Sequence, residues 1–518
     1  MNAPRFFTAV LLLASFISAA GAQNTTSSAD AAHRDLDAIG AAIQPMPQDA
    51  EISRALARIS AAQIQDAIST LVSFRNRSTL SVLEKDLPPG TGIVAAADWI
   101  ESQFKQISAA CGGCLEVHRD SFIQPPLPGP ISGVTQPTPV TDVYAVMRGA
   151  DPSQAARMIL VTGHYDSRDN NGVTIHGGPG ANDDASGTAV SLECARVLSK
   201  VKLPATLVFV AVAGEEQGLL GSKHLAEEAK QDNWQLEGAL NNDIVGGNHT
   251  PGDRFQDEHA VRVFSESVPL NASTEEMHRY LALGYEGDSP SRELARAIVD
   301  VARTYTGAPI PYSDKPNRAG LEPVLEFRRD RFDRGGDHSS FNRQGFAAVR
   351  FSEWREDFNH QHQNVRVEDG VQYGDLLKYD NFNYIARVAR LNAATMAVLS
   401  AAPPPPVTVQ YPPPRSVLTS YTNALNNTQI EWDAAPGTPA GTDYEILWRP
   451  TAGPDWTRSI PANRLARIPD GRFSSSGGHY SVQIPVSRDN VVFGVRAVDA
   501  KGHRSPAAVP WPAPRPER

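Results

Sequence analysis

The chain has 518 residues, of which 41% are hydrophobic and 20% are charged. This is enough apolar material for sizeable cores and more than one ordinary domain needs, so two or more folded units are expected. The formal net charge of -10 is spread along the chain without a long run of one sign, which excludes the basic footprint of a nucleic-acid-binding protein.

Residues 1–22 have the order of a signal peptide. Arg5 precedes an apolar stretch that runs from Phe6 to about Ile17, and the small residues Ala20-Gly21-Ala22 form a cleavage site. A membrane anchor is the alternative, but the stretch is shorter than the ~20 residues that a span needs. The sequence therefore predicts a secreted or periplasmic protein with no stable membrane insertion after signal removal.

Residues 23–90 begin polar and continue with helical periodicity, which predicts a helical cap or a propeptide. A second helical pattern follows at 92–107. From Met158 onward, apolar strands alternate with helices, so residues 91–402 are expected to form an α/β layered unit. Between these regions, Cys111 and Cys114 flank two glycines, and in an exported protein they are expected to close a small structural disulfide. Cys194 is expected to be a buried apolar side chain.

Acidic residues and one histidine stand where apolar strands end. The strand-like run 158–163 ends at His164-Tyr165-Asp166, where residues two apart point to the same side. His164 and Asp166 suit a metal-binding imidazole that is held by a carboxylate. Taken without the other motifs, the pair is also explained by a structural hydrogen bond. The run 206–213 leads into Glu215-Glu216, neighbouring carboxylates that repel unless a cation compensates. In open α/β sheets, ligands bind at such strand ends.

Three further segments complete two possible metal sites. Asp183-Asp184 precede a helical pattern, and one of them exceeds what helix capping needs. An apolar approach ends at Asp243, and His360 and His362 supply one more imidazole. Oxygen and nitrogen ligands without thiolate suit zinc or a similar divalent ion.

In this order, the motifs resemble those of the co-catalytic zinc aminopeptidases of the M28 family, over roughly residues 60–400. The resemblance implies a zinc exopeptidase fold, with a mixed, mostly parallel sheet flanked by helices, and two zinc ions per chain. It implies peptide or protein substrates with a free N-terminus. The roles it implies are one zinc held by His164 and Asp243, the other by Glu216 and His362, Asp183 as the bridge, Glu215 as the general base and Asp166 as the orienting carboxylate.

Two local departures from the family pattern concern the end of this region. Asp337-His338-Ser339 resembles the family's Ser-Asp-His segment with Gly336 in place of Ser, and it is expected to line the site wall. The usual His-Thr-x-x-Asp context reads His362-Gln363-Asn364-Val365-Arg366, so His360 stays an alternative last ligand.

Other functions remain open on the same scaffold. Glutaminyl cyclases share it and use one zinc, and arginines such as Arg328, Arg329 and Arg331 could hold the carboxylate of a carboxypeptidase substrate. A non-catalytic binding protein would lack Glu215 or a ligand, and none is missing from the sequence.

A proline tract from Pro403 to Pro406 opens the last region, 403–518. Such tracts form stiff linkers, so little contact is expected with the preceding unit, which should fold without the tail. Short alternating segments separated by turn residues predict a small all-β sandwich. Trp432 and the segment 495–499 followed by Gly502 resemble a fibronectin type III domain, although Val491 stands where that family often has tyrosine.

Overall fold

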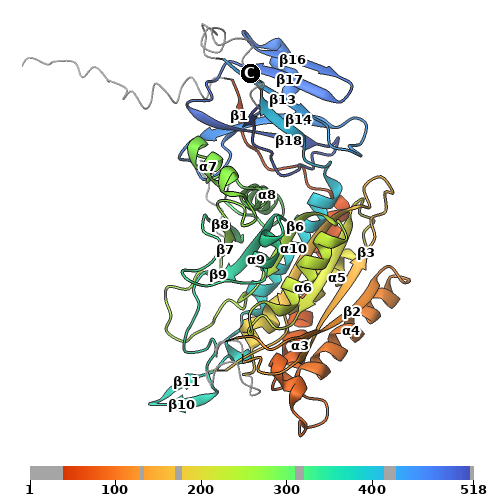
Figure 1. The fold of residues 1–518 in the computed structure, drawn as a ribbon, viewed down its shortest axis with the longest axis vertical. Coiled ribbons are helices and arrows are strands. Elements are labelled where there is room, and N and C mark those ends of the chain that lie inside the picture. Colours follow the sequence, from red (N-terminus) through yellow and green to blue (C-terminus); the bar gives the residue numbers. More distant parts are fainter. Residues whose placement is uncertain (1–38, 129–132, 170–177, 310–319, 413–426, 514–518) are drawn as a thin grey trace, which may run out of the picture. The chain divides into compact units, whose positions relative to one another are not determined.

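The computed structural model describes residues 39–128, 133–169, 178–309, 320–412 and 427–513 (Figure 1). The predicted signal peptide, 1–22, lies outside these ranges. None of the helices in the described ranges is both long and apolar enough to cross a membrane.

A mixed sheet of eight strands forms the centre of the α/β part. Strands β4, β5, β6 and β9 run parallel to their neighbours in this group, whereas β2, β3 and β7 join through antiparallel pairs. The strands, in spatial order, are β2 (Glu116–Gln124), β3 (Thr138–Met147), β5 (Thr206–Val212), β4 (Arg157–His164), β6 (Gln235–Asn242), β9 (Ala348–Glu353), β7 (Ala260–Ser265) and β8 (Glu322–Glu326). The predicted α/β class with a mixed sheet is confirmed.

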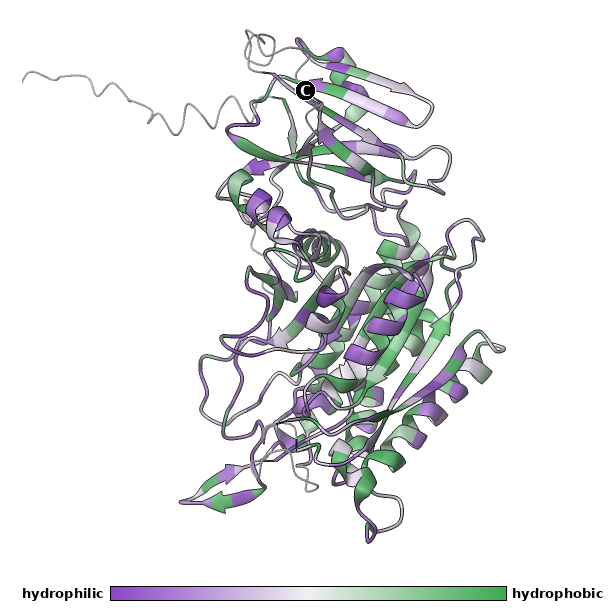
Figure 2. Cartoon of the chain, viewed as in Figure 1, coloured by the Kyte–Doolittle hydropathy of each residue, from purple (hydrophilic) through white to green (hydrophobic). Residues whose placement is uncertain are grey.

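Helices cover both faces of this sheet, and the alternation of β4 shows why. Ile159 and Val161 point into one apolar cluster, whereas Leu160 points into another on the opposite face. Figure 2 shows the central strands as predominantly hydrophobic. The helices on the first face are α3 (Ala61–Ser73), α4 (Gly92–Ala110), α5 (Ser186–Leu198), α8 (Pro290–Tyr305) and α10 (Phe382–Ala401), and those on the second are α6 (Leu220–Gln231) and α9 (His338–Arg343).

The N-terminal helical segment is part of the first core. Helix α2 (Ala50–Leu56) and helix α3 bury Leu56, Ile64, Ile68 and Leu71, the apolar side chains that gave the helical periodicity. Ser60 caps α3 by accepting the amide of Gln63. Whether this segment is removed as a propeptide stays a prediction.

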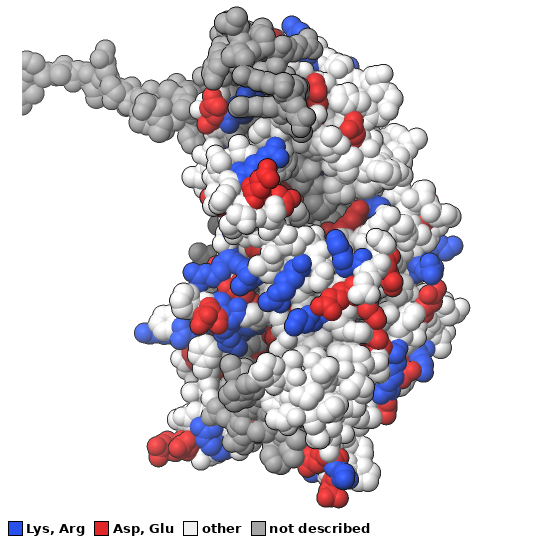
Figure 3. Space-filling view, viewed as in Figure 1, with Lys and Arg blue, Asp and Glu red and all other residues white. Residues whose placement is uncertain are grey.

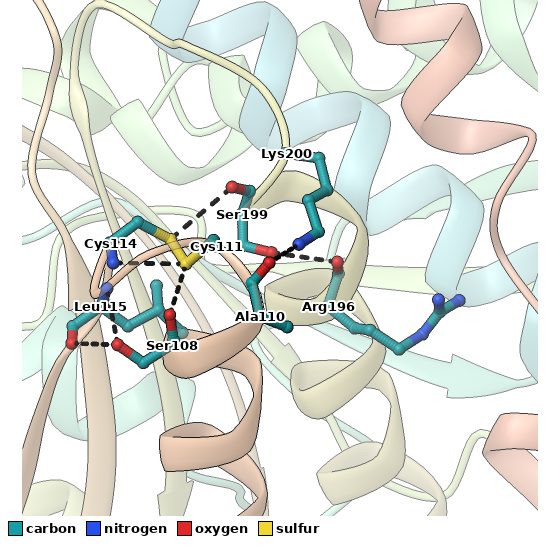
Figure 4. Close-up of a disulfide and its surroundings, with 8 residues drawn as sticks. All are labelled: Ser108, Ala110, Cys111, Cys114, Leu115, Arg196, Ser199 and Lys200. Carbon is teal, nitrogen blue, oxygen red and sulfur yellow. Dashed lines mark hydrogen bonds between the residues drawn. A yellow bond between two sulfur atoms is a disulfide. The ribbon is translucent and has the colours of Figure 1, made fainter.

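The predicted disulfide is present between Cys111 and Cys114, after the end of α4 (Figure 4). Both intervening glycines have left-handed backbone angles, with φ of 80° and 85°, which glycine adopts without steric cost. The Lys200 ammonium, just beyond α5, donates to the carbonyl of Ala110, so the cysteine loop lies against the end of that helix. Cys194 is free and buried, as predicted.

The C-terminal region forms two β-sheets, and the short strand β1, near the start of the described chain, joins one of them. One consists of β1 (Ala41–Ala42), β15 (Arg458–Pro461), β14 (Asp443–Pro450) and β18 (Val491–Val498), and the other of β16 (Arg472–Ser476), β17 (His479–Ile484), β13 (Thr428–Asp433), β12 (Val407–Tyr411) and β19 (Trp511–Pro512). Trp432 is fully buried. The likeness to fibronectin type III remains a prediction.

A separate hairpin of β10 (Arg366–Glu368) and β11 (Val371–Tyr373) follows the His362 segment, and helix α7 (Thr274–Leu283) precedes α8.

The expectation of little contact across the proline tract is wrong. Arg496 on β18 pairs with Asp300 on α8 at 2.6 Å, and Arg303 on the same helix pairs with Asp455 at 2.6 Å. The indole nitrogen of Trp456 donates to Glu293 at 3.0 Å. The proline tract stops α10, as a residue without an amide hydrogen must, but it does not hold the following strands away from α8.

Candidate metal centre

The polar residues predicted at strand ends meet at one edge of the large sheet. His164 is the last residue of β4, Glu215 and Glu216 follow β5, and Asp243 follows β6. Strands β5, β4 and β6 are adjacent and parallel, so their carboxyl ends lie side by side. The sheet topology therefore brings together residues that are far apart in sequence.

The first cluster consists of His164, Asp183 and Asp243. His164 Nε2 lies 3.2 Å from Asp183 Oδ1 and 3.9 Å from Asp243 Oδ1. On the other side of the ring, His164 Nδ1 lies 3.3 Å from Asp166 Oδ1 and 3.1 Å from the Asp166 carbonyl oxygen. Asp166 thus faces the nitrogen that points away from the cluster, which orients the ring.

The second cluster shares Asp183 with the first. His362 Nε2 lies 2.9 Å from Asp183 Oδ2 and 3.1 Å from Glu216 Oε1. Asp183 therefore turns one carboxylate oxygen towards each cluster. Gln361 donates its side-chain amide to the same Asp183 Oδ2 at 3.1 Å, which fixes the carboxylate from the direction of the histidine loop.

The protonation chemistry of the two clusters favours a bound cation. Burial lowers the pKa of His164, but Asp166 and Asp183 outweigh it and raise that pKa well above its ordinary value. Burial also lowers the pKa of His362, but Glu216 and Asp183 outweigh it and raise that pKa to about 10. Carboxylates that crowd both imidazoles create a demand for positive charge, which a divalent ion meets without protonating its ligands.

Unpartnered atoms support the same fit. His164 Nε2 and Glu216 Oε1 are inaccessible to solvent and have no hydrogen-bond partner among the described residues. Both atoms point into the clusters, where a metal ion would satisfy them. One imidazole nitrogen and carboxylate oxygens in each cluster form a donor set that suits zinc.

Glu215 differs from its neighbour Glu216. Its backbone amide donates to Asp166 Oδ1 at 3.3 Å, whereas its carboxylate makes no hydrogen bond or ion pair to any part of the chain that the structure describes. Burial, followed by the charges of Asp243 and Glu216, raises the pKa of Glu215 well above its ordinary value. A free carboxylate that holds a proton readily suits proton transfer.

The remaining candidates fall into different positions. His360 stacks on Tyr379 with ring centroids 3.7 Å apart, and its Nδ1 lies 3.1 Å from Asn248 Oδ1, so the geometry places His362 and not His360 in the cluster. Asp337 is buried. Burial raises its pKa to about 7, although the nearby charge of His164 acts to lower it. Asp184 accepts the amides of His164 and Gly187 at 3.0 and 2.9 Å and serves the backbone rather than a metal.

Several supporting residues were missed by the sequence analysis. Arg350, fully buried on β9, contacts Asp243 Oδ1 at 2.8 Å. Asp375 accepts the amides of Asn182 and Asp183 at 2.9 and 2.7 Å. Arg77 donates to the carbonyl oxygens of Tyr165 and Gly180 and so ties the two ligand loops together. The one signal in the sequence was Arg350, which stands within the apolar segment that forms β9. A buried charge requires a partner, so this arginine indicated a nearby carboxylate.

Residues 142–287 match peptidase family M28. A protein of Pyrenophora tritici-repentis named "Probable zinc metalloprotease" is 38% identical over 499 residues, which cover 95% of this chain and 93% of that protein. A protein of the same name from Pyricularia oryzae is 37% identical over 482 residues, covering 92% of this chain and 87% of its own. Among solved structures, LapB from Legionella pneumophila has a TM-score of 0.45 and 21% identity, covering 73% of this chain and 83% of that one.

These sequence relatives match this chain over nearly the whole length of both proteins. The chain belongs to peptidase family M28 and is a zinc metallopeptidase.

Proposed function

We propose that this protein is an exported aminopeptidase that uses two zinc ions to release N-terminal residues from peptides. The observation that carries the two-metal part is the position of Asp183, whose Oδ1 faces His164 at 3.2 Å and whose Oδ2 faces His362 at 2.9 Å. A carboxylate that serves two clusters at once is the geometry of a bridging ligand. Export rests on the leader at residues 1–22.

The residues around the clusters divide the work of amide hydrolysis. When bound, the zinc ions supply Lewis acidity that polarises the scissile carbonyl and lowers the pKa of water. Glu215 accepts the proton of the attacking water and returns it to the leaving amine, because its carboxylate is not engaged by another residue of the described chain. Asp166 keeps the His164 ring in place throughout.

An aminopeptidase needs a pocket that favours a free α-ammonium group. The site is acidic, since Asp183, Glu215, Glu216 and Asp243 gather at one sheet edge. Of the arginines considered for a carboxypeptidase, Arg331 is already paired, with Asp330 at 3.0 Å and Glu356 at 2.8 Å.

The test compares matched peptides that differ only in N-terminal acetylation. Losing a charge-assisted contact costs ~1.5 to 3 kcal/mol, and misplacing the carbonyl by about 1 Å costs ~100-fold in rate, so the acetylated peptide should be cleaved at least ~1000-fold less efficiently. The measurement is kcat/KM with zinc saturating. Equal values would refute the aminopeptidase assignment, and cyclisation of an N-terminal glutamine without hydrolysis would identify a cyclase.

The number of catalytic ions needs its own experiment. Because Asp183 faces both clusters, Asp183→Ala should lower the zinc content by two ions per chain in equilibrium dialysis. Loss of a single ion in correctly folded protein would show a one-metal centre.

A further inference from the structure

A third group of metal-binding side chains lies away from the catalytic centre. His224 and Glu228 are four residues apart on α6 and therefore share one face of that helix. His224 Nε2 lies 3.3 Å from Glu228 Oε1 and 3.3 Å from Asp120 Oδ2 on β2. The three ligand atoms lie within 4.8 Å of one another.

Side chains along β2 point alternately to opposite faces of the sheet, and Asp120 lies on the face that α6 covers. Arg119, the preceding residue, points to the other side and pairs with Glu101 on α4 at 3.2 Å. Phe122, two residues beyond Asp120, stacks on the His224 ring with centroids 4.1 Å apart. The imidazole is thus held between the edge strand and the helix with Nε2 facing both carboxylates.

This geometry repeats that of the two catalytic clusters. In each of the three groups, one histidine Nε2 faces oxygens of two different carboxylates, at 3.2 and 3.9 Å for His164, 2.9 and 3.1 Å for His362, and 3.3 and 3.3 Å for His224. Within the ranges that the structure describes, these are the three groups in which such ligand atoms converge. The third shares no residue with the others.

The charges of the third group are not balanced by the protein. Across the described chain, no lysine or arginine pairs with Asp120 or Glu228, so the imidazole is their one basic neighbour. Asp120 Oδ2 is inaccessible to solvent and has no hydrogen-bond partner among the described residues. A buried carboxylate oxygen without a donor is costly unless a cation occupies the space that it faces.

We propose that Asp120, His224 and Glu228 bind an additional divalent ion of the zinc class, separate from the catalytic centre. One imidazole nitrogen and two carboxylate oxygens are ligands that zinc accepts, and the partial exposure of His224, 27% of its side chain, leaves room for water as a further ligand. The ion joins edge strand β2 to α6, the helix that follows the Glu215-Glu216 loop. Its role is to hold that helix against the sheet.

The test is the zinc content of the full-length protein in equilibrium dialysis across a range of free zinc. His224→Ala and Glu228→Gln should each bind one ion per chain fewer than the unmodified protein. Glu227→Gln is the matched control, since Glu227 is the exposed neighbour of Glu228 on the same helix and belongs to no cluster. His278→Ala, an exposed histidine on α7, controls for the loss of an imidazole.

The outcome is independent of how many ions the catalytic centre holds, because it is a difference between variants. Equal zinc content in His224→Ala, Glu228→Gln and the unmodified protein at every free-zinc concentration overturns the site. A loss in Glu227→Gln as large as in Glu228→Gln overturns it as well. With Asp183→Ala the catalytic ions go and the additional ion stays, so failure of the two-zinc proposal and failure of this one are distinguishable.

Discussion

Arg496→Met tests whether the C-terminal sheets stabilise the catalytic part. Arg496 is buried, and its guanidinium lies 2.6 Å from Asp300 on α8 and 2.8 Å from Glu445 on β14. Burial raises the pKa of Asp300, but the nearby arginines, Arg496 first, outweigh it and lower that pKa. The substitution leaves two carboxylates at a buried interface without their closest cation.

The expected loss follows from the contacts that remain. Removing one partner of a buried pair costs about 3 to 5 kcal/mol. Here Arg504 stays 3.6 Å from Asp300 and 3.7 Å from Glu445, and Arg303 stays 3.3 Å from Asp300, so we expect the lower part of that range, about 3 kcal/mol. For a chain of this size, this corresponds to a fall in Tm of about 3 °C.

The assay follows peptidase activity and circular dichroism along the same urea titration. Both midpoints should fall together, because the damaged contact connects α8 to β18. Arg472→Met, an exposed position on β16, is the control and should leave both unchanged. If activity were lost at the original urea concentration while only the β-sheet signal shifted, the two parts would be independent and the reasoning refuted.

Three more predictions concern single carboxylates. Glu215→Gln should keep its zinc but lose ~100- to 10,000-fold in kcat, because the amide cannot accept a proton; near-normal turnover contradicts its role. Glu216→Gln should lose zinc as well as rate, since Glu216 faces His362 at 3.1 Å, and unchanged metal content by elemental analysis would exclude it as a ligand. Burial raises the pKa of Glu266 from 4.5 to about 7, so wild-type stability falls as pH rises between these values, by at most about 3 kcal/mol. Glu266→Gln should lack this fall, and parallel Tm curves for the two proteins between pH 5 and 8 would disprove it.

Much of the site was readable from local patterns. A buried-strand run that ends in a polar residue predicts both the strand and its role at the sheet edge, as His164 and Glu216 show. The disulfide was readable from two glycines between Cys111 and Cys114. These features depend on neighbours in sequence, so a single sequence contains them.

The partners of distant residues were not readable. Helix α8 carries Arg296, Asp300 and Arg303, which resemble the solvent-facing side of an amphipathic helix, yet all three are buried against the C-terminal sheets. Surface charge of both signs is intermingled on the face in Figure 3, so composition alone does not distinguish these buried ion pairs from exposed ones. Arg350 and Asp243 were likewise separate observations until β9 and β6 were placed side by side.

The short strand β1 relates the order of synthesis to the order of folding. Ala41 pairs with Ser459, and the neighbouring Ile43 donates its amide to the carbonyl of Thr457 at 3.3 Å. At a ribosomal rate of about 5 to 20 residues per second, these partners are made about 20 to 80 s apart. The early segment therefore waits without its strand partner while the whole catalytic part is translated. The last sheet acquires its edge strand from the first described residues of the nascent chain, so translation must be nearly complete before the native topology can close.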